Sequence, residues 1–324
     1  MKKTLLVASL ATLFATPSMA NNTLYGDFRA SLNTGDLNGA DNNAKIENNA
    51  SRFGLKGSQG NDGLKAIYHL EMGANNDSNG DALTARFYFA GLEGSMGKLI
   101  YGRMSTPYKM TGVAQDPFYD TSAGAGNAGS NYGYSSLING FTDNSFAYYS
   151  PSFGGLSFNA SASIDDSAED NHAYAAGIQY KAGGFTAGVN HMMIDDTATS
   201  ATVAGSDGLD SATRVYAGMK MGAFGVNASY EMLEKTAGGD DATLMNVNAT
   251  FKMSSALTAA ASYGKVEDGI GTSGLNASGD NITAGIFYNV LPKTTVHALY
   301  TNTDYDAAAV ADRDGVAIGV KQMF

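Results

Sequence analysis

Apolar and polar residues alternate one by one along much of this chain. The segment MNVNATFK (245–252) sets methionine, valine, alanine and phenylalanine against asparagine, threonine and lysine. The segments FGVNASYE (224–231), LSFNASAS (156–163) and NITAGIFYNV (281–290) repeat the pattern over eight to ten residues. Successive side chains of a β-strand point to opposite faces, so strict alternation predicts strands with one apolar and one polar face. We therefore expect an all-β fold.

The composition of the two faces indicates a barrel in a membrane. Small uncharged Asn, Ser, Thr and Gly dominate the polar face. After the first twenty residues, no apolar run approaches the ~20 residues that a membrane helix needs. Aromatic residues gather toward the predicted strand ends, namely Tyr230, Tyr263, Tyr288, Tyr300 and Phe324. Lipid outside, water inside and aromatic belts at both interfaces would account for all three features.

The connections between the predicted strands alternate between short and long. Seven short turns and eight long polar loops divide the chain into sixteen strands, the first at Leu24–Leu32 and the last at Gly315–Phe324. An even strand number, short turns on one side and longer loops on the other are typical of bacterial outer-membrane barrels. An open sheet edge is not stable in lipid, so the first and last strands are expected to pair. The prediction is a transmembrane antiparallel β-barrel that forms one domain over residues 21–324.

The first twenty residues, MKKTLLVASLATLFATPSMA, have the order of a secretory signal peptide. Two lysines precede a short apolar stretch, and small residues lead to Ala20. We expect cleavage after Ala20 and export through the periplasm. Losing the two lysines would shift the formal net charge from −11 to −13. The chain has no cysteine, so disulfides do not stabilise it.

Several segments together resemble the general porins of the Gram-negative outer membrane. They are LYGDF (24–28), SRFGLKG (51–57), ARFYFAGLEGSMG (85–97), YGR (101–103), NSFAYYSPSFGGLSF (144–158) and the terminal Phe324. The resemblance implies a sixteen-stranded barrel, usually a homotrimer, for passive diffusion of small hydrophilic solutes and ions. It also implies that the third loop folds inward and narrows the channel, and that the outer-membrane assembly machinery recognises Phe324.

The resemblance and the strand phase together suggest a basic wall along the channel. Arg52 and Arg86 fall on basic-wall positions of the family, and Glu71 matches an acidic position nearby. The phase of the alternation turns Arg29 and Lys56 inward, because Leu24, Phe28, Phe53 and Leu55 occupy the lipid phase. Arg103 lies where the chain enters the long third loop.

The long segment 104–142 is the predicted constriction loop. Its region carries three acidic residues, Asp116, Asp120 and Asp143, against Lys109 as the one basic residue. We expect Asp116 or Asp120 to face the wall arginines, since opposed fixed charges across a narrow water path filter solutes by charge. The alternative is a loop that partly covers the channel mouth and whose acidic side chains are solvated by water.

The chain departs from the family pattern at three positions. Phe141 and Ala147 stand where relatives often carry Arg, and Gln322 stands where the terminal pattern often has an aromatic residue. The basic wall is thinner as a result. Together with the acidic net charge, this leads us to expect a weak preference for cations.

Other functions find little support in the residues. The motif GAGNAG (124–129) fits a dinucleotide-binding fingerprint letter by letter, but no apolar strand precedes it and no helical pattern follows it. The four histidines have no metal spacing, no cofactor site is expected, and an acidic chain is an implausible partner for nucleic acid. The alternatives are a solute-preferring porin for a sugar or an anion, a plugged adhesin barrel, or a barrel hydrolase with an outer-wall Ser-His pair. The acidic outer loops could share divalent ions with lipopolysaccharide.

Overall fold

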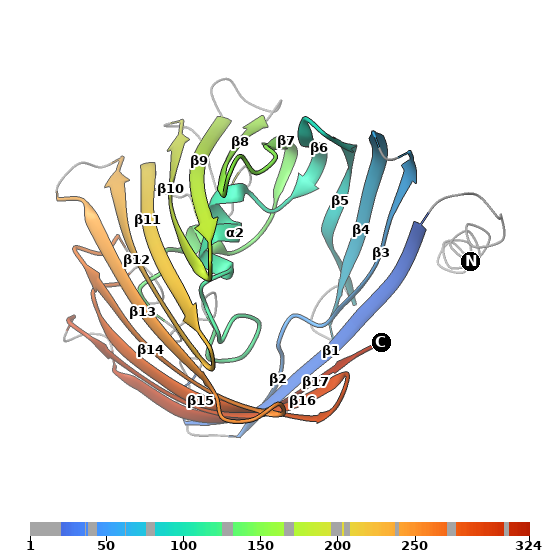
Figure 1. Cartoon of the computed structure of the whole chain (residues 1–324). Helices are drawn as coiled ribbons and strands as arrows, with labels where there is room; N and C mark the ends of the chain where they lie inside the picture. Colours follow the sequence, from blue (N-terminus) through green and yellow to red (C-terminus); the bar gives the residue numbers. More distant parts are fainter. Residues whose placement is uncertain are drawn as a thin grey trace.

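A computed structural model describes residues 21–35, 37, 44–61, 63–75, 82–124, 132–164, 172–195, 203, 208–236, 240–270, 277–307 and 311–324. The predicted signal peptide, residues 1–20, lies outside the described residues, as does nearly all of GAGNAG. Strands make up most of the described chain, as the alternation predicts (Figure 1). No helix in the described ranges is long and apolar enough to cross a membrane.

Seventeen strands, one short α-helix and one 3-10 turn follow one another along the described chain. The elements are β1 (Asn21–Gly35), β2 (Lys45–Asn48), β3 (Arg52–Gly60), β4 (Leu64–Ala74), β5 (Leu83–Gly94), β6 (Gly97–Met104), α2 (Pro107–Val113), η1 (Ser136–Ile138), β7 (Thr142–Tyr149), β8 (Leu156–Ile164), β9 (His172–Ala182), β10 (Phe185–Ile194), β11 (Leu209–Met221), β12 (Phe224–Lys235), β13 (Ala242–Lys252), β14 (Leu257–Glu267), β15 (Gly279–Leu291), β16 (Thr294–Tyr305) and β17 (Arg313–Met323).

The strands close into one antiparallel barrel. From β3 to β17 each strand pairs with the next one in the sequence, and β1 completes the ring by pairing with β17 on one side and with β2 and β3 on the other. Strands β2 and β3 are two parts of one crossing, interrupted at Asn49–Ser51, where Ala50 adopts a φ of 61°. The barrel therefore has sixteen crossings, which confirms the predicted fold class, with the second crossing broken in two.

The two faces of each strand differ as the alternation requires. On β1, Leu24, Phe28 and Leu32 are exposed on the outside, whereas Asp27 and Ser31 are buried toward the interior. Removing polar groups from lipid while keeping apolar groups in it is what stabilises such a wall. The inward direction predicted for Arg29 from its phase agrees with this pattern.

One irregularity in β5 changes which side chains enter the barrel. In the ladder with β4, Glu71 pairs with Phe87 and Met72 with Ala85, so Arg86 is an extra residue between two paired ones. A β-bulge of this kind shifts the phase of the alternation. As a result Arg86 and Phe87 are both half-buried inside the barrel, although they are neighbours in the chain.

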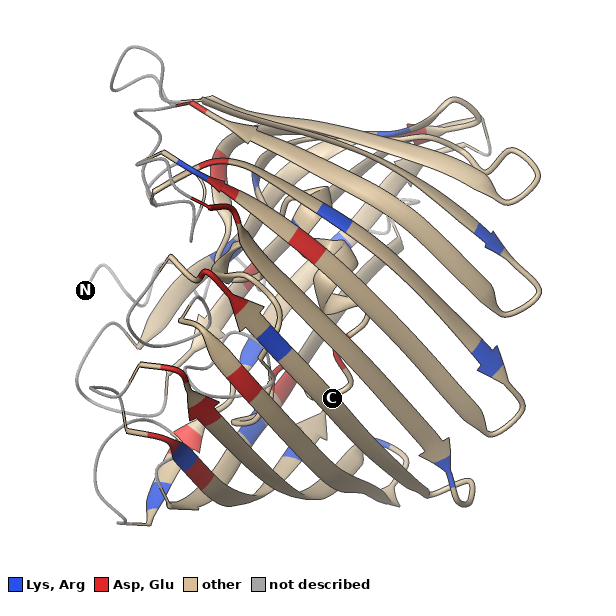
Figure 2. Ribbon diagram, turned by 90° about the vertical axis from the view of Figure 1, so that its left-hand side faces the viewer, with Lys and Arg blue, Asp and Glu red and all other residues tan. Residues whose placement is uncertain are grey.

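Charge is unevenly distributed along the barrel axis (Figure 2). Acidic side chains gather at the end with the long loops, where Glu234, Glu267 and Asp304 lie near the ends of β12, β14 and β16. Lysines lie at the opposite end, near the short turns. The two ends of the barrel therefore carry opposite charge.

Candidate functional site: the barrel interior around residues 104–142

The helix α2 begins the segment that connects β6 to β7. The hydroxyl of Thr106 accepts a hydrogen bond of 3.0 Å from the backbone N–H of Lys109, and Pro107 occupies the first helical turn. Both features favour a helix start at this position. Figure 1 shows α2 within the ring of strands, between β3–β6 on one side and β9–β12 on the other.

A buried ion pair holds this segment to the wall formed by β11 and β12. Arg214 and Glu231 form a salt bridge of 2.9 Å, and both are almost fully buried. The hydroxyl of Tyr108 donates to Glu231 (2.7 Å), and the Arg214 guanidinium donates to the Tyr108 carbonyl (2.8 Å). Ser135 donates to the same carboxylate through its N–H and its hydroxyl. Because each charge has several partners, the pair can exist without solvent.

A second set of contacts joins the segment to the wall formed by β1 and β3. The carboxylate of Asp120 forms salt bridges of 2.5 Å with both Arg29 and Arg52. Asp27 on β1 pairs with the same arginines, at 2.8 Å and 3.7 Å. Asp120 also has a φ of 61°, a left-handed conformation that Asp and Asn tolerate better than most residues. The structure thus brings Asp120, Arg29 and Arg52 into direct contact.

The neighbouring wall residues form a separate polar group. Arg86, turned inward by the bulge, donates through Nε to Glu71 (2.7 Å), and the Tyr25 hydroxyl donates to the same carboxylate (2.6 Å). Tyr25 also contacts the His69 ring through its hydroxyl. Glu71 is thereby neutralised by its partner and satisfied by hydrogen bonds, as a buried carboxylate requires.

Three cations surround the ring of Phe141. The Lys109 Nζ lies 4.3 Å from the ring centroid, the Arg86 guanidinium 4.9 Å and the Arg103 guanidinium 5.5 Å. Lys109 also donates to the carbonyl of Gly140 (2.6 Å). Burial, with Arg86 nearby, lowers the pKa of the Lys109 ammonium to about 7.

The remaining predicted site residues are placed as follows. Asp143 forms a salt bridge of 2.6 Å with Arg103 and is exposed. Asp116 accepts a hydrogen bond of 2.7 Å from the backbone N–H of Phe118, within its own segment. Lys56 lies over the ring of Tyr25, 5.3 Å from its centroid.

Phe324 ends the barrel seam rather than lining the interior. Its ring lies 6.0 Å from that of Phe28 and fills the space beside Gly26, and its backbone N–H donates to the Gly26 carbonyl at 3.0 Å. Gln322, the predicted departure near this end, accepts a hydrogen bond of 2.6 Å from the Thr294 hydroxyl.

A polar cavity of about 330 Å³ lies between the segment and the wall. Lys109, Tyr119, Asp120 and Phe141 line it from the segment. Arg86 and the amide and hydroxyl side chains of Asn48, Asn49, Ser51, Asn75 and Thr84 line it from the wall. The pKa of Tyr119 rises to about 12, because the side chain is buried and Asp120 is close. Charged and hydrogen-bonding groups converging on a space of this size can hold a small polar solute.

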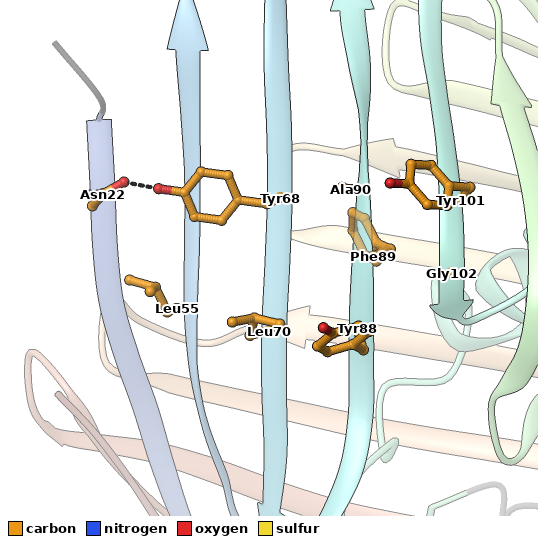
Figure 3. A pocket seen from close by; sticks show the side chains of 9 residues that line it. All are labelled: Asn22, Leu55, Tyr68, Leu70, Tyr88, Phe89, Ala90, Tyr101 and Gly102. Carbon is orange, nitrogen blue, oxygen red and sulfur yellow. Dashed lines mark hydrogen bonds between the residues drawn. The ribbon is translucent and has the colours of Figure 1, made fainter. Parts of the chain in front are cut away.

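A different hollow, of about 390 Å³, lies on the outer face of the barrel (Figure 3). Leu55, Leu70 and the rings of Tyr68, Tyr88 and Tyr101 border it, and Tyr68 donates a hydrogen bond to Asn22 at its edge. Tyr88 and Tyr101 are 69% and 57% exposed. This surface is apolar with a polar rim, in contrast to the interior cavity.

Four interior residues that the sequence reasoning did not single out complete the charged interior. The alternation puts Arg214 and Glu231 on the interior faces of adjacent strands, where they lie opposite each other. The alternation therefore contained the information from which this ion pair could have been predicted. Lys321 lies opposite Arg29 in the β1–β17 ladder, and Asp27 pairs with Arg29 within β1. Across the described ranges, no group of three or more His, Asp and Glu side chains is arranged to hold a metal ion.

The sequence matches a family model described as Gram-negative porin over residues 6–308. Among curated proteins, it is 34% identical over 197 residues to the major outer membrane protein P.IB of Neisseria meningitidis serogroup B. That alignment covers 57% of this chain and 57% of the relative, so the match spans little more than half the relative's length. An outer membrane porin protein of Bordetella pertussis is 32% identical over 200 residues, covering 54% of this chain and 51% of that protein.

Two solved structures illustrate the shared fold. The anion-selective porin from Comamonas acidovorans has a TM-score of 0.74 at 18% identity, covering 94% of this chain and all of that one. OmpT of Vibrio cholerae, in a trimer form, has a TM-score of 0.65 at 17% identity, covering 94% of this chain and 99% of that one. At such identities the likeness concerns the fold alone.

Proposed function

The chain belongs to the Gram-negative porin family of outer-membrane proteins, and we propose that it forms a water-filled channel for passive diffusion of small hydrophilic solutes and ions. The observation that carries the proposal is the closed ring with two unlike faces. Large apolar side chains are exposed on the outside, while Asn, Ser and Thr side chains such as Asn246, Ser262 and Thr283 face the interior. A polar interior inside a lipid-facing wall is how barrels of this size conduct water-soluble compounds.

Residues 104–142 act as the constriction of this channel. The support is that one segment bonds to two walls: Tyr108 to Glu231 on β12, and Asp120 to Arg29 and Arg52 on β1 and β3. A chain segment tied at both sides reduces the free cross-section between them. Solutes would then pass beside the Asp120 salt bridges, where the polar cavity lies.

The charges beside the constriction favour small anions. The wall arginines are matched by carboxylates, whereas Lys109 adds a cation next to Phe141, the position where the sequence lacks the family's arginine. This arrangement supports a weak anion preference, the sign opposite to the one expected from the net charge and the missing arginines. The acidic end with the long loops supports the alternative, a weak cation preference set at the mouth.

The functional unit is a homotrimer in this proposal. The support is the apolar outer hollow over β3–β6, whose exposed tyrosines would be buried against a second copy (Figure 3). Phe324 serves as the recognition signal for the assembly machinery, and the acidic loop ends bind lipopolysaccharide through divalent ions. Cross-linking of the outer-membrane protein would show trimers, and a chain that stays monomeric in membranes would contradict this part.

The proposal assigns no catalytic role to this chain. His191 contacts the Thr213 hydroxyl at 2.8 Å on the outer wall, and no acid joins this pair in the described chain to form a triad. A plugged adhesin barrel is disfavoured by the cavity beside the segment. Measuring ester hydrolysis by the purified protein would test the hydrolase alternative.

The channel is tested by reconstitution into planar bilayers and liposomes. Stepwise KCl conductance and liposome swelling with small sugars are expected from correctly folded, heat-modifiable protein. Folded protein without conductance would refute the channel, and conductance without sugar passage would restrict it to ions. The reversal potential in a KCl gradient decides between the anion and cation preferences.

A further inference from the structure

The polar cavity beside the constriction is lined by a lysine that forms no salt bridge with any described residue. Four arginines around it pair with four carboxylates, the pairs being Arg29 and Arg52 with Asp27 and Asp120, Arg86 with Glu71, and Arg103 with Asp143. Lys109 is the fifth cation, and within the described residues no carboxylate lies at ion-pair distance from its Nζ. Lys109 therefore adds a positive charge that these four pairs do not balance whenever it is protonated.

The Lys109 ammonium keeps hydrogen-bonding capacity on the side of the cavity. It has three N–H donors, and the structure assigns one of them, to the Gly140 carbonyl. The helix start at Thr106 fixes its backbone, and the Gly140 carbonyl and the ring of Phe141 hold its side chain, so it does not have to be ordered again when a ligand binds. Lys109 is only 5% exposed, and such a buried ammonium gains strongly from a counter-ion.

Arg86 faces the same cavity from the opposite side. Its Nε is bonded to Glu71, its guanidinium packs on Phe141, and the residue lines the cavity. Lysine and arginine groups converging on one small space bind carboxylate or phosphate oxygens well. The amides and hydroxyls of Asn49, Ser51 and Thr84 line the rest of the wall and can bond solute hydroxyls.

We propose that this cavity is a saturable binding site for the oxyanion group of a small solute, a carboxylate or a phosphate, held between Lys109 and Arg86. The site deepens the proposed channel function, on which it rests, because a solute bound there lies beside the path of diffusion. The lowered pKa of Lys109 agrees with an unfilled counter-ion position. The charged groups that face Lys109 are Arg52 on β3, Glu71 on β4, Arg86 on β5, Arg103 on β6 and Asp120 on its own segment.

The test measures how added solutes reduce the KCl current of single channels. Succinate and inorganic phosphate are the oxyanion probes, and succinamide and erythritol are neutral compounds of similar size. Either oxyanion should block the current with a saturating concentration dependence, and comparing the two shows which chemistry the site prefers. The neutral compounds should block far less. An open channel in which neither oxyanion blocks, or in which the neutral compounds block equally, overturns the site and leaves the channel standing.

Variants assign the effect to the cavity. Lys109→Met should raise the half-blocking concentration about tenfold or more, since a charge-assisted contact is lost. The matched control is Lys252→Met, because Lys252 lies at the short-turn end of β13, away from the cavity. Equal blockade in both variants would overturn the assignment. Calorimetric titration of the folded wild-type protein with the same compounds is independent of conductance, so it separates failure of the site from failure of the channel.

Discussion

The Asp120 carboxylate gives the sharpest test of the constriction. It bonds to Arg29 and Arg52 at 2.5 Å each and is the contact that joins the 104–124 segment to the β1–β3 wall. Asp120→Asn removes the negative charge but keeps the size and the tolerance for a φ of 61°. The change therefore acts on the ion pairs rather than on the backbone.

The size of the effect follows from burial and from the remaining partners. Breaking a fully buried ion pair costs about 3–5 kcal/mol, and an exposed pair about 0–1 kcal/mol. The side chains here are 11–13% exposed in a water-filled channel. Asp27 still pairs with both arginines after the change, although it balances only one of their two charges. We therefore expect a loss of about 2 kcal/mol, which corresponds to roughly a thirtyfold rise in the population of the undocked segment.

Single-channel recording measures both consequences. Asp120→Asn should increase open-channel noise and conductance, and the reversal potential in a KCl gradient should shift toward the chloride potential, because the wall gains one net positive charge. The control is Asp143→Asn, which breaks a salt bridge of similar length whose carboxylate is 55% exposed. Equal shifts in the two variants, or no shift in Asp120→Asn, would refute the idea that Asp120 fastens the constriction.

Three further outcomes are expected. The pKa of Lys109 is lowered to about 7, so its positive charge is present below that pH and is lost as the pH rises through it. The anion preference, measured as the reversal potential, should therefore decline over this range. A reversal potential that does not change with pH would contradict this role of Lys109. Gly26→Ala would bring a Cβ into steric conflict with the Phe324 ring, at a cost of about 1–3 kcal/mol. We therefore expect less heat-modifiable barrel in the outer membrane, and an unchanged yield would exclude this contact as important. Tyr108→Phe removes one of several hydrogen-bond donors to Glu231 and should lower the stability of the docked segment by about 1–2 kcal/mol. The expected sign is increased noise in the open-channel current. Unaltered noise would argue against Tyr108 as a residue that holds the segment to the wall.

Local periodicity accounts for the part of the fold that the sequence predicts. Alternation identifies a strand and its two faces from neighbouring residues alone, and turn lengths order the strands, so the sixteen crossings and the inward direction of Arg29 follow without any tertiary information. The same phase places Arg214 and Glu231 on interior faces of adjacent strands. Their partner Tyr108 belongs to a segment without such a period, and its position could not be read in this way.

Tertiary structure decided the chemistry at the centre of the barrel. Strict alternation would put Arg86 on the lipid face with Tyr88, and only the bulge opposite Glu71 and Met72 turns it inward. A bulge depends on how two strands register against each other, which a single segment does not specify. The meeting of Lys109 with Phe141 likewise depends on the path of a long loop across the barrel. The sequence alone determined the barrel wall, because its signal is periodic and local. Contacts between residues distant in the chain decided which charges lie beside the path of diffusion.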